Sequence, residues 1–271
     1  MTFRDLADRL KSAGVENYSG EAAILIEHFC GVNPSRLPFL GERELDSEEL
    51  ETALRRRESG EPLQYIIGEW SFMNEVYEVS PSVLIPRQDT ETLVEWAVKN
   101  IPRGGRFADL CTGSGCVAIS TLAARSDLTC LAVEKYPDAL EVAKKNAVKN
   151  GVADRVDFVC ADVLRGDSLQ GSFDVIVSNP PYISVEEYGT LAREIFFEPS
   201  HALTDGADGL TFYRTIFDIY PGKLGSNGKM ALEIGSGQAE DVIRIAAFAG
   251  MSAEIIKDLS GNDRVVVCKM L

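Results

Sequence analysis

Residues 178–184 read SNPPYIS, and within them Asn179, Pro180, Pro181 and Tyr182 have the clearest chemical meaning in the chain. An asparagine amide offers one acceptor and two donors. Prolines lack an N–H, so their segment presents carbonyl oxygens without competing donors. The Asn179 Oδ1 atom and the Pro180 carbonyl can therefore accept both hydrogens of a planar NH₂ group, with the Tyr182 ring against its flat face. The segment predicts recognition of a conjugated amine or amide.

The nitrogen of such a group is a weak nucleophile because its lone pair is delocalised. Two acceptors concentrate electron density on it and hold it in line with an electrophile such as a methyl sulfonium. Positioning of this kind can supply up to roughly 7–11 kcal/mol of a barrier. No metal is needed, and two histidines without a CxxC pair give no reason to expect a zinc site. The alternative is a rigid turn after a strand, which rarely needs Asn, two prolines and an aromatic residue in that order.

The stretch FADLCTGSGCVAIS predicts a nucleotide-type cofactor site at a strand–helix turn. Glycines let the backbone approach a ligand, and the following helix presents free N–H groups. The G-x-G-x-x-A spacing fits the dinucleotide fingerprint, which is a weak signal by itself. The turn residues that we expect to contact the cofactor are Asp109, Cys111, Thr112, Gly113, Ser114 and Gly115.

Two further acids follow predicted strands and strengthen this interpretation. Glu134 ends the strand LAVE, where a carboxylate can accept from two ribose hydroxyls. Asp162 ends the next strand, where it can face an adenine amino group while Val163 packs on the ring. Each acid alone could be a solvated loop residue or a helix cap. A nicotinamide dinucleotide and S-adenosylmethionine fit these features equally well, and the NPPY segment separates them.

The elements around these residues predict an α/β protein. Residues 1–67 are helical in pattern, and residues 68–86 alternate like a β-hairpin. From residue 90 strands and helices alternate, which favours a doubly wound, mostly parallel Rossmann-like sheet closed by an antiparallel hairpin. We expect a helical bundle at 1–67, a hairpin linker at 68–88 and a Rossmann-like domain at 89–271. The bundle is assigned to substrate docking, although amphipathic helices suit a packing scaffold equally.

Composition limits the class of partner. The 271 residues carry a formal net charge of −15, and acids outnumber bases both before and after residue 80. A phosphate-backbone binder would carry a basic surface, so we expect no direct nucleic-acid binding. The chain has no apolar run of membrane-spanning length and no apolar core of a signal peptide, so we expect a cytoplasmic protein, by default a monomer. Its six cysteines are expected to be buried free thiols.

DVIVSNPPY with DLCTGSG before it resembles the S-adenosylmethionine-dependent amino-methyltransferases, which include DNA adenine methyltransferases and the glutamine methyltransferases of translation release factors. The linker with its IPRQDTE segment, FFEPSHAL after NPPY, and GNDRV near the C-terminus are similar to the release-factor family (HemK/PrmC type). The resemblance covers nearly the whole chain from residue 61.

The resemblance implies methyl transfer from S-adenosylmethionine to the glutamine side-chain amide in the GGQ loop of class 1 peptide chain release factors. It implies that Gly113 and Gly115 cradle the methionine part of the cofactor. By the same resemblance Glu134 binds ribose, Asp162 with Val163 holds adenine, and Asn179 to Tyr182 grip the glutamine. The chain departs from the family at three positions: Cys111 stands where glycine is usual, Glu134 where aspartate is usual, and Gln88 where proline is common.

Three other readings remain open. A DNA or RNA adenine N6-methyltransferase would also grip a conjugated amine, but it must hold a phosphodiester and extrude its base, which the acidic charge disfavours. A nicotinamide oxidoreductase leaves NPPY unexplained, and a non-catalytic adaptor would be expected to lose Asn179 or the glycines. Outside the site, we expect Arg87 to fix the linker through an ion pair, Glu198 to orient the loop after NPPY, and His201 to be a structural loop residue.

Overall fold

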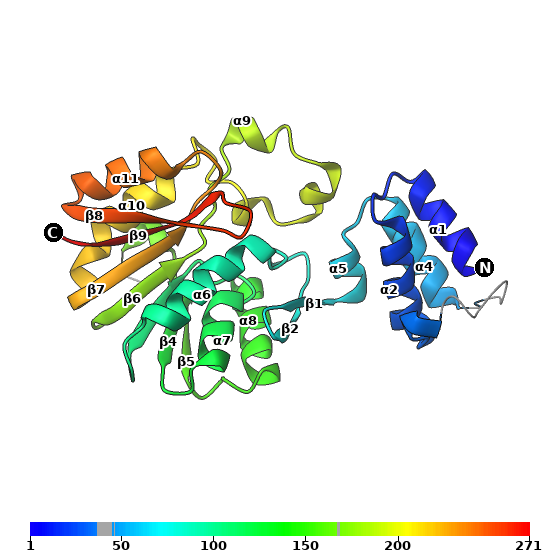
Figure 1. Cartoon of the computed structure of the whole chain (residues 1–271), viewed down its shortest axis with the longest axis horizontal. Coiled ribbons are helices and arrows are strands. Elements are labelled where there is room, and N and C mark those ends of the chain that lie inside the picture. The colour runs from blue at the N-terminus through cyan, green and yellow to red at the C-terminus, as the bar shows by residue number, and fades with distance from the viewer. Residues whose placement is uncertain (37–44, 46, 167–168) are drawn as a thin grey trace. The chain divides into compact units, whose positions relative to one another are not determined.

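A computed structural model of the chain describes residues 1–36, 45, 47–166 and 169–271. By their internal packing these residues form two compact units. The helical unit comprises Met1–Glu69 with Ala192–Phe197, and the sheet unit comprises Trp70–Leu191 with Glu198–Leu271. Figure 1 shows both, coloured along the chain.

Short helices with clear capping signals make up the helical unit. Thr2 and Asp5 form a capping box at the first helix, since each side chain accepts from the other residue's backbone N–H. The helix Glu48–Glu58 begins after its N-cap residue Ser47. It has acids in its first turn and arginines in its last, as the helix dipole favours. The helices are α1 (Phe3–Ser12), α2 (Tyr18–Cys30), η1 (Pro34–Arg36), α4 (Glu48–Glu58), α5 (Leu63–Ile67) and η4 (Arg193–Phe197).

One buried charge cluster ties this unit together. The Arg57 side chain is 4% exposed and forms ion pairs with Glu21 and Glu194, each at 2.6 Å. A buried guanidinium is tolerated only when it is paired, so Glu194 fastens its short helix to α4. The apolar core consists of fully buried residues from α1, α2 and α4, namely Leu6, Leu10, Leu25, Ile26, Leu50 and Leu54.

The sheet unit holds a two-stranded hairpin and a seven-stranded sheet. The strands are β1 (Glu69–Phe72), β2 (Glu75–Glu78), β3 (Arg106–Leu110), β4 (Thr129–Glu134), β5 (Val156–Cys160), β6 (Phe173–Ser178), β7 (Leu224–Glu233), β8 (Met251–Lys257) and β9 (Asp263–Met270). The helices are η2 (Gln88–Thr90), α6 (Glu91–Asn100), α7 (Cys116–Ala124), α8 (Pro137–Lys149), η3 (Val163–Arg165), α9 (Val185–Tyr188), η5 (Ser200–Ala202), α10 (Thr211–Ile219), η6 (Pro221–Lys223) and α11 (Ala239–Phe248).

The strand order is β5-β4-β3-β6-β7-β9-β8, with β3 to β7 parallel and β9 antiparallel to both neighbours. The chain therefore winds outward from β3 in one direction to β5 and then returns to β6 on the other side. Ligands bind at such a switch point, at the carboxyl ends of the central strands. The predicted Rossmann-like sheet, the linking hairpin and the closing antiparallel pair are confirmed.

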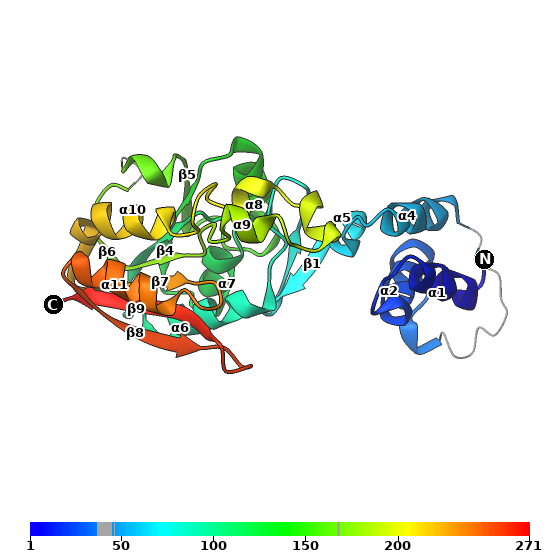
Figure 2. The same ribbon diagram turned by 90° about the horizontal axis from the view of Figure 1, so that it is seen from above.

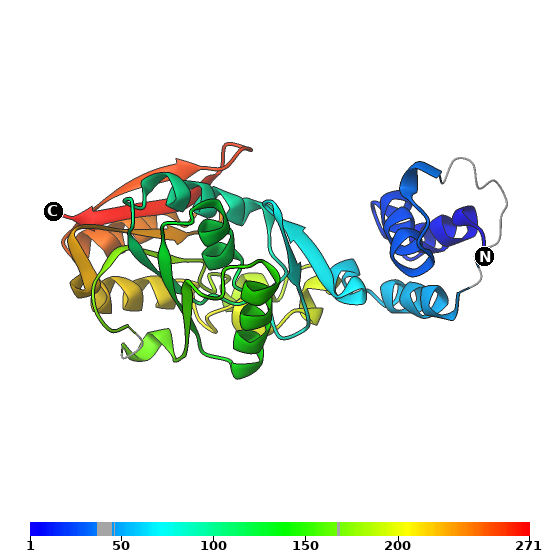
Figure 3. The same ribbon diagram turned by 90° about the horizontal axis from the view of Figure 1, so that it is seen from below.

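Helices cover both faces of the seven-stranded sheet. Figures 1 and 2 show α10 and α11 on one face, and Figure 3 shows the teal and green helices α6, α7 and α8 in front of the other. Side chains alternate along each strand: Phe107 packs under α6 to α8, whereas Ala108 and Leu110 pack under α10 and α11. This alternation fixes which strand-end side chains share a face.

A few sequence expectations need correction. Asp162 does not end β5, because the strand stops at Cys160 and Asp162 instead caps η3 by accepting from the Leu164 N–H. All six cysteines are free, as expected, but only Cys130 and Cys268 are buried. Cys30, Cys111 and Cys116 are partly exposed, and Cys160 is exposed. The error at Asp162 comes from a strand that ends two residues earlier than its apolar pattern suggested.

Candidate functional site

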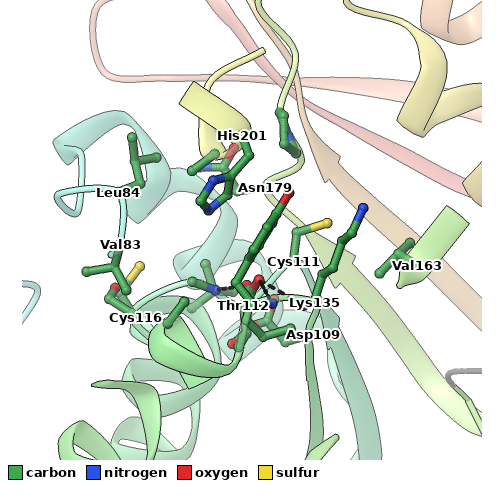
Figure 4. Close-up of a pocket in the computed structure, with 18 of the residues that line it drawn as sticks. Val83, Leu84, Asp109, Cys111, Thr112, Cys116, Lys135, Val163, Asn179 and His201 are labelled. Carbon is green, nitrogen blue, oxygen red and sulfur yellow. Dashed lines mark hydrogen bonds between the residues drawn. The ribbon is translucent and has the colours of Figure 1, made fainter. Parts of the chain in front are cut away.

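A pocket of about 920 Å³, counted with its open mouth, lies at the carboxyl ends of β3, β4 and β6. Figure 4 shows Val83 and Leu84 on one side of the pocket and Lys135 and Val163 on the other. The predicted residues that line it are Asp109, Cys111, Thr112, Gly113, Ser114, Glu134, Asp162, Val163, Asn179 and Pro181.

Strand alternation brings the key polar side chains to one face. Asp109, the last residue but one of β3, is in register with Ala132 and Val177, whose side chains belong to the core under α6 to α8. Glu134 lies two residues beyond Ala132, and Asn179 two residues beyond Val177. Because side chains repeat every second residue, the two acids and the amide reach the same edge and the same face.

The glycine loop is held rigidly from both sides. Thr112 donates its hydroxyl to Asp109 Oδ2 at 2.5 Å and its N–H to the Val133 carbonyl at 3.0 Å. The buried Asn146 side chain donates to the Ser114 carbonyl at 2.9 Å. Gly113 has a φ of 56° and a Cβ placed on it would meet no atom within 4 Å, so its backbone is open toward a ligand.

Cys111 shares this unusual backbone. Its φ is 60°, the left-handed region that favours glycine, which explains why glycine is usual here. Burial raises the pKa of its thiol well above the ordinary value, and the neighbouring acids Glu134 and Asp109 add to the effect. Cys111 therefore stands in the pocket as a neutral, strained loop residue rather than a reactive thiolate.

The acids of the pocket already hold backbone and side-chain donors. Glu134 Oε2 accepts from the Gly113 N–H at 2.9 Å, and its Oε1 accepts from the N–H groups of Lys135 and Tyr136. Burial nevertheless raises the pKa of Glu134. The Asp162 Oδ2 atom lies 3.0 Å from Lys135 Nζ. Burial acts to raise the pKa of Asp162, but hydrogen bonds from Lys135 and the Leu164 N–H outweigh it and lower this pKa.

Of the NPPY residues, Asn179 and Pro181 line the pocket, whereas Pro180 and Tyr182 lie next to them in the chain and do not line it. Asn179 donates its Nδ2–H to the buried Thr90 Oγ1 atom at 3.1 Å. This bond engages the amide nitrogen and leaves Oδ1 as the acceptor available to a ligand. Pro180 is buried beside the pocket. Tyr182 turns its hydroxyl toward Glu233 Oε1 at 3.5 Å, and its carbonyl accepts from Gln238 Nε2 at 2.9 Å.

Comparisons with known proteins agree with this geometry. Residues 2–68 match the model of the PrmC N-terminal domain, and residues 88–211 match the model of the methyltransferase small domain. A release factor glutamine methyltransferase of Rhodospirillum rubrum is 39% identical over 96% of this chain and 82% of its own length. One of Nitratidesulfovibrio vulgaris is 36% identical over 98% and 93%. The chain belongs to the release factor glutamine methyltransferase family.

The fold of the sheet unit is the methyltransferase fold. A methyltransferase structure from Pyrococcus furiosus superposes with a TM-score of 0.53, at 20% identity, over 71% of this chain and 87% of that one. In the part of the chain that the structure describes, no group of three or more His, Cys, Asp or Glu side chains could hold a metal ion. No helix in the described ranges is long and apolar enough to cross a membrane.

The structure adds pocket residues that sequence reasoning missed. His201, expected to be structural only, lines the pocket and stacks on Tyr136 with ring centroids 3.5 Å apart. Burial and the nearby Lys135 lower the pKa of His201, so the stack is a neutral aromatic wall near pH 7. Thr90 was also missed. The strand pattern carries no signal for these contacts, because His201 lies 65 positions from Tyr136 and Thr90 lies 89 positions from Asn179.

The family segments IPRQDTE and FFEP meet beside the pocket. Arg87 forms the predicted ion pair, and its partner is Glu198. Glu198 also accepts from the Ile85 N–H at 3.1 Å. Glu198 lies in the segment that follows NPPY, so these contacts fasten that segment to the linker, in keeping with the orienting role suggested by the sequence. The start of the segment is also held by Gln238, whose side chain donates to the Tyr182 carbonyl.

Proposed function

We propose that this protein is a protein-(glutamine-N5) methyltransferase. It transfers a methyl group from S-adenosylmethionine to a glutamine side-chain amide nitrogen. The glutamine is that of the GGQ motif in class 1 peptide chain release factors. The observation that carries the proposal is Asn179, with its amide nitrogen held by Thr90 and its oxygen left as an acceptor. Family membership and a pocket at the switch point of a methyltransferase fold support it.

The lining residues fit S-adenosylmethionine. The open backbone at Gly113 gives room for the methionine part, and the acid Glu134 beside it suits ribose hydroxyls. Val163 is apolar and buried, as a surface under adenine should be, and Asp162 lies next to it in the sequence. We assign the remaining turn residues Asp109, Cys111, Thr112, Ser114 and Gly115 to shaping this cradle. When bound, the cofactor supplies a methyl group activated by a sulfonium.

The chain's own residues orient the acceptor. We propose that Asn179 Oδ1 and the Pro180 carbonyl accept the two amide hydrogens of the glutamine, and that Pro181 and Tyr182 keep this segment rigid. Because prolines have no N–H, no donor in the segment competes for those carbonyls. The grip concentrates charge on the amide nitrogen and orients its lone pair. The amide proton leaves to solvent after transfer, so the site needs no strong base.

Mass spectrometry tests the proposal directly. A purified class 1 release factor is incubated with the protein and S-adenosylmethionine, and the GGQ peptide is examined for one added methyl group. We expect the methyl with the wild type and its loss with Asn179→Ala. Asn100→Ala, which removes an exposed amide of the same unit, is the matched control and should retain transfer. Transfer to an adenine oligonucleotide instead of the peptide would refute the proposal.

We further propose that residues 1–67 dock the release factor, that the protein acts as a monomer in the cytoplasm, and that it binds no nucleic acid directly. The match of residues 2–68 to the PrmC N-terminal domain and the exposed acids Glu48 and Glu49 on α4 support docking of a basic protein surface. Replacing both acids by Gln should raise KM for the release factor and leave kcat unchanged. Glu240→Gln on α11 is the matched control, and equal KM values in the two variants would refute docking at α4.

A further inference from the structure

Glu233 is a buried carboxyl at the carboxyl end of β7, and its side chain is fully shielded from solvent. The preceding residue, Leu232, pairs with Ser178 on the parallel strand β6. Glu233 and Asn179 therefore follow paired positions at the ends of adjacent strands. Neither the sequence motifs nor the proposed amide grip account for an acid here.

The contacts of Glu233 lead to the NPPY segment by two routes. Tyr182 donates its hydroxyl to Glu233 Oε1 at 3.5 Å. The Thr90 hydroxyl faces the same carboxyl and also accepts from Asn179 Nδ2 at 3.1 Å. The other carboxyl oxygen, Oε2, is buried without a hydrogen-bond partner in the described residues. A buried acceptor without a partner lowers the stability of the fold, so its presence here calls for an explanation.

The charges around Glu233 leave it close to a protonation change at neutral pH. Burial raises the pKa of Glu233 to about 7, and the charge of Asp89 acts in the same direction. Thr90, Arg264 and Tyr182 act to lower this pKa. Arg264, which lowers this pKa, is itself paired with Asp89 at 2.9 Å and Asp258 at 3.1 Å. Two further titratable neighbours are Tyr213, whose hydroxyl donates to the Glu233 backbone carbonyl, and Cys116.

We propose that Glu233 is a positioning residue that acts through Thr90 and Tyr182 to fix the orientation of the Asn179 amide, an inference that rests on the proposed function. An ionised carboxylate can only accept hydrogen bonds. The Thr90 hydroxyl then donates to Glu233, and its oxygen must accept from Asn179, which keeps Asn179 Oδ1 toward the substrate. A protonated Glu233 competes as a donor for the Thr90 oxygen and frees the threonine hydrogen, so the amide orientation is no longer enforced.

Kinetics over pH 5.5–9 with full-length protein and a class 1 release factor test this role. For Glu233→Gln we expect kcat to fall about tenfold to a hundredfold at pH 8, as for other orienting partners. The dissociation constant for S-adenosylmethionine should stay unchanged. The acid limb of kcat/KM, which reports the free enzyme, should lose the component near pH 7 that Glu233 contributes. Thr90→Val should lower kcat in the same way, and Thr90→Ser should retain it.

Unchanged kcat and an unchanged pH profile in Glu233→Gln would overturn the proposal. Loss of cofactor affinity and of the cooperative unfolding transition together with activity would also overturn it, because the role would then be structural. Asp109 is a second buried acid whose pKa burial raises to about 7, so the comparison between variant and wild type is diagnostic, whereas the wild-type profile alone is not.

A measurement without turnover separates this inference from the proposed function. The Asn179 side-chain amide signal in a ¹⁵N spectrum, assigned by its loss in Asn179→Asp, should shift with a midpoint near pH 7 in the wild type and stay fixed in Glu233→Gln. An identical titration in both proteins would overturn the inference. If the amide signal titrates in the wild type and not in Glu233→Gln, but the wild type leaves the release factor unmethylated, only the proposed function is refuted.

Discussion

Arg87 and Glu198 lie 111 residues apart in the chain and form an ion pair beside the pocket. Arg87 belongs to the linker segment whose preceding residues Val83 and Leu84 line the pocket. Glu198 precedes the short helix that carries His201, another lining residue. One ion pair therefore holds together two walls of the pocket that come from distant parts of the sequence.

Removing Arg87 should destabilise the protein. The Glu198 side chain is 2% exposed and that of Arg87 is 37% exposed, so Arg87→Ala leaves a buried carboxylate without its main partner. Breaking a fully buried pair costs about 3–5 kcal/mol, and the partial exposure of Arg87 reduces this to about 2 kcal/mol. Urea denaturation measures the loss in free energy of unfolding.

Arg214→Ala is the matched control, because Arg214 and Asp208 form an ion pair in which both side chains are about half exposed. It should cost less than about 1 kcal/mol. The double variant Arg87→Ala with Glu198→Gln should recover part of the loss, since the remaining group is neutral. Equal effects of the two arginine substitutions would show that the ion pair at Glu198 gives no special support.

The two loop glycines should respond differently to alanine. A Cβ on Gly115 would lie 2.7 Å from Ile119 Cδ1 and 3.3 Å from Ala143 Cβ, where α7 meets α8. A Cβ on Gly113 would meet nothing within 4 Å. Both have positive φ, which costs an alanine about 1–2 kcal/mol. Gly115→Ala should lose about 1–3 kcal/mol more than Gly113→Ala through overpacking.

Calorimetric titration completes this comparison. The open space beside Gly113 is the space proposed for the cofactor, so Gly113→Ala should weaken binding of S-adenosylmethionine while the protein keeps most of its stability. A Gly113→Ala variant that binds the cofactor normally would argue against the cradle at this residue. A Gly115→Ala variant as stable as Gly113→Ala would argue against the packing role of Gly115.

The sequence predicted the parts of this protein that rest on local periodicity. The alternation of β3, β4 and β6 and the turns after them placed Asp109, Glu134 and Asn179 at one edge, because strand direction and side-chain parity follow from local pattern. It did not predict contacts that depend on how loops fold back. The Tyr136–His201 stack joins residues 65 positions apart, and no periodicity links them.

Cys111 allows a direct measurement of backbone strain. Its φ of 60° suits glycine, whereas a residue with a Cβ in this region costs about 1–2 kcal/mol. Cys111→Gly and Cys111→Ala both remove the thiol, but only glycine removes the strain. Cys111→Gly should therefore be more stable than Cys111→Ala by about 1 kcal/mol in free energy of unfolding. Equal stabilities would mean that the loop relaxes around a Cβ at this position.

Asp109 should make the protein less stable as pH rises toward neutrality. Burial raises the pKa of Asp109 from its ordinary 3.8 to about 7, although the Thr112 hydroxyl and the Ala118 N–H act to lower it. Between these values the folded protein holds a proton that the unfolded chain releases, so the free energy of unfolding falls with rising pH. The slope is about 1.4 kcal/mol per pH unit at most. Asp109→Asn cannot titrate and should lose this slope.

The decisive quantity is the difference between Asp109→Asn and the wild type in free energy of unfolding, measured in urea without cofactor from pH 5 to pH 8. Glu233 titrates in both proteins and cancels. This difference should grow in favour of the variant by about 2–3 kcal/mol between pH 5 and 7 and then level off.

Asp162→Asn is the matched control. Because the pKa of Asp162 lies below its ordinary value, its contribution is complete above pH 5 and is lost only in acid, so its difference from the wild type should be flat. A flat difference for Asp109→Asn as well would mean that Asp109 is ionised in the folded protein throughout this range, with its charge stabilised by the Thr112 and Ala118 donors.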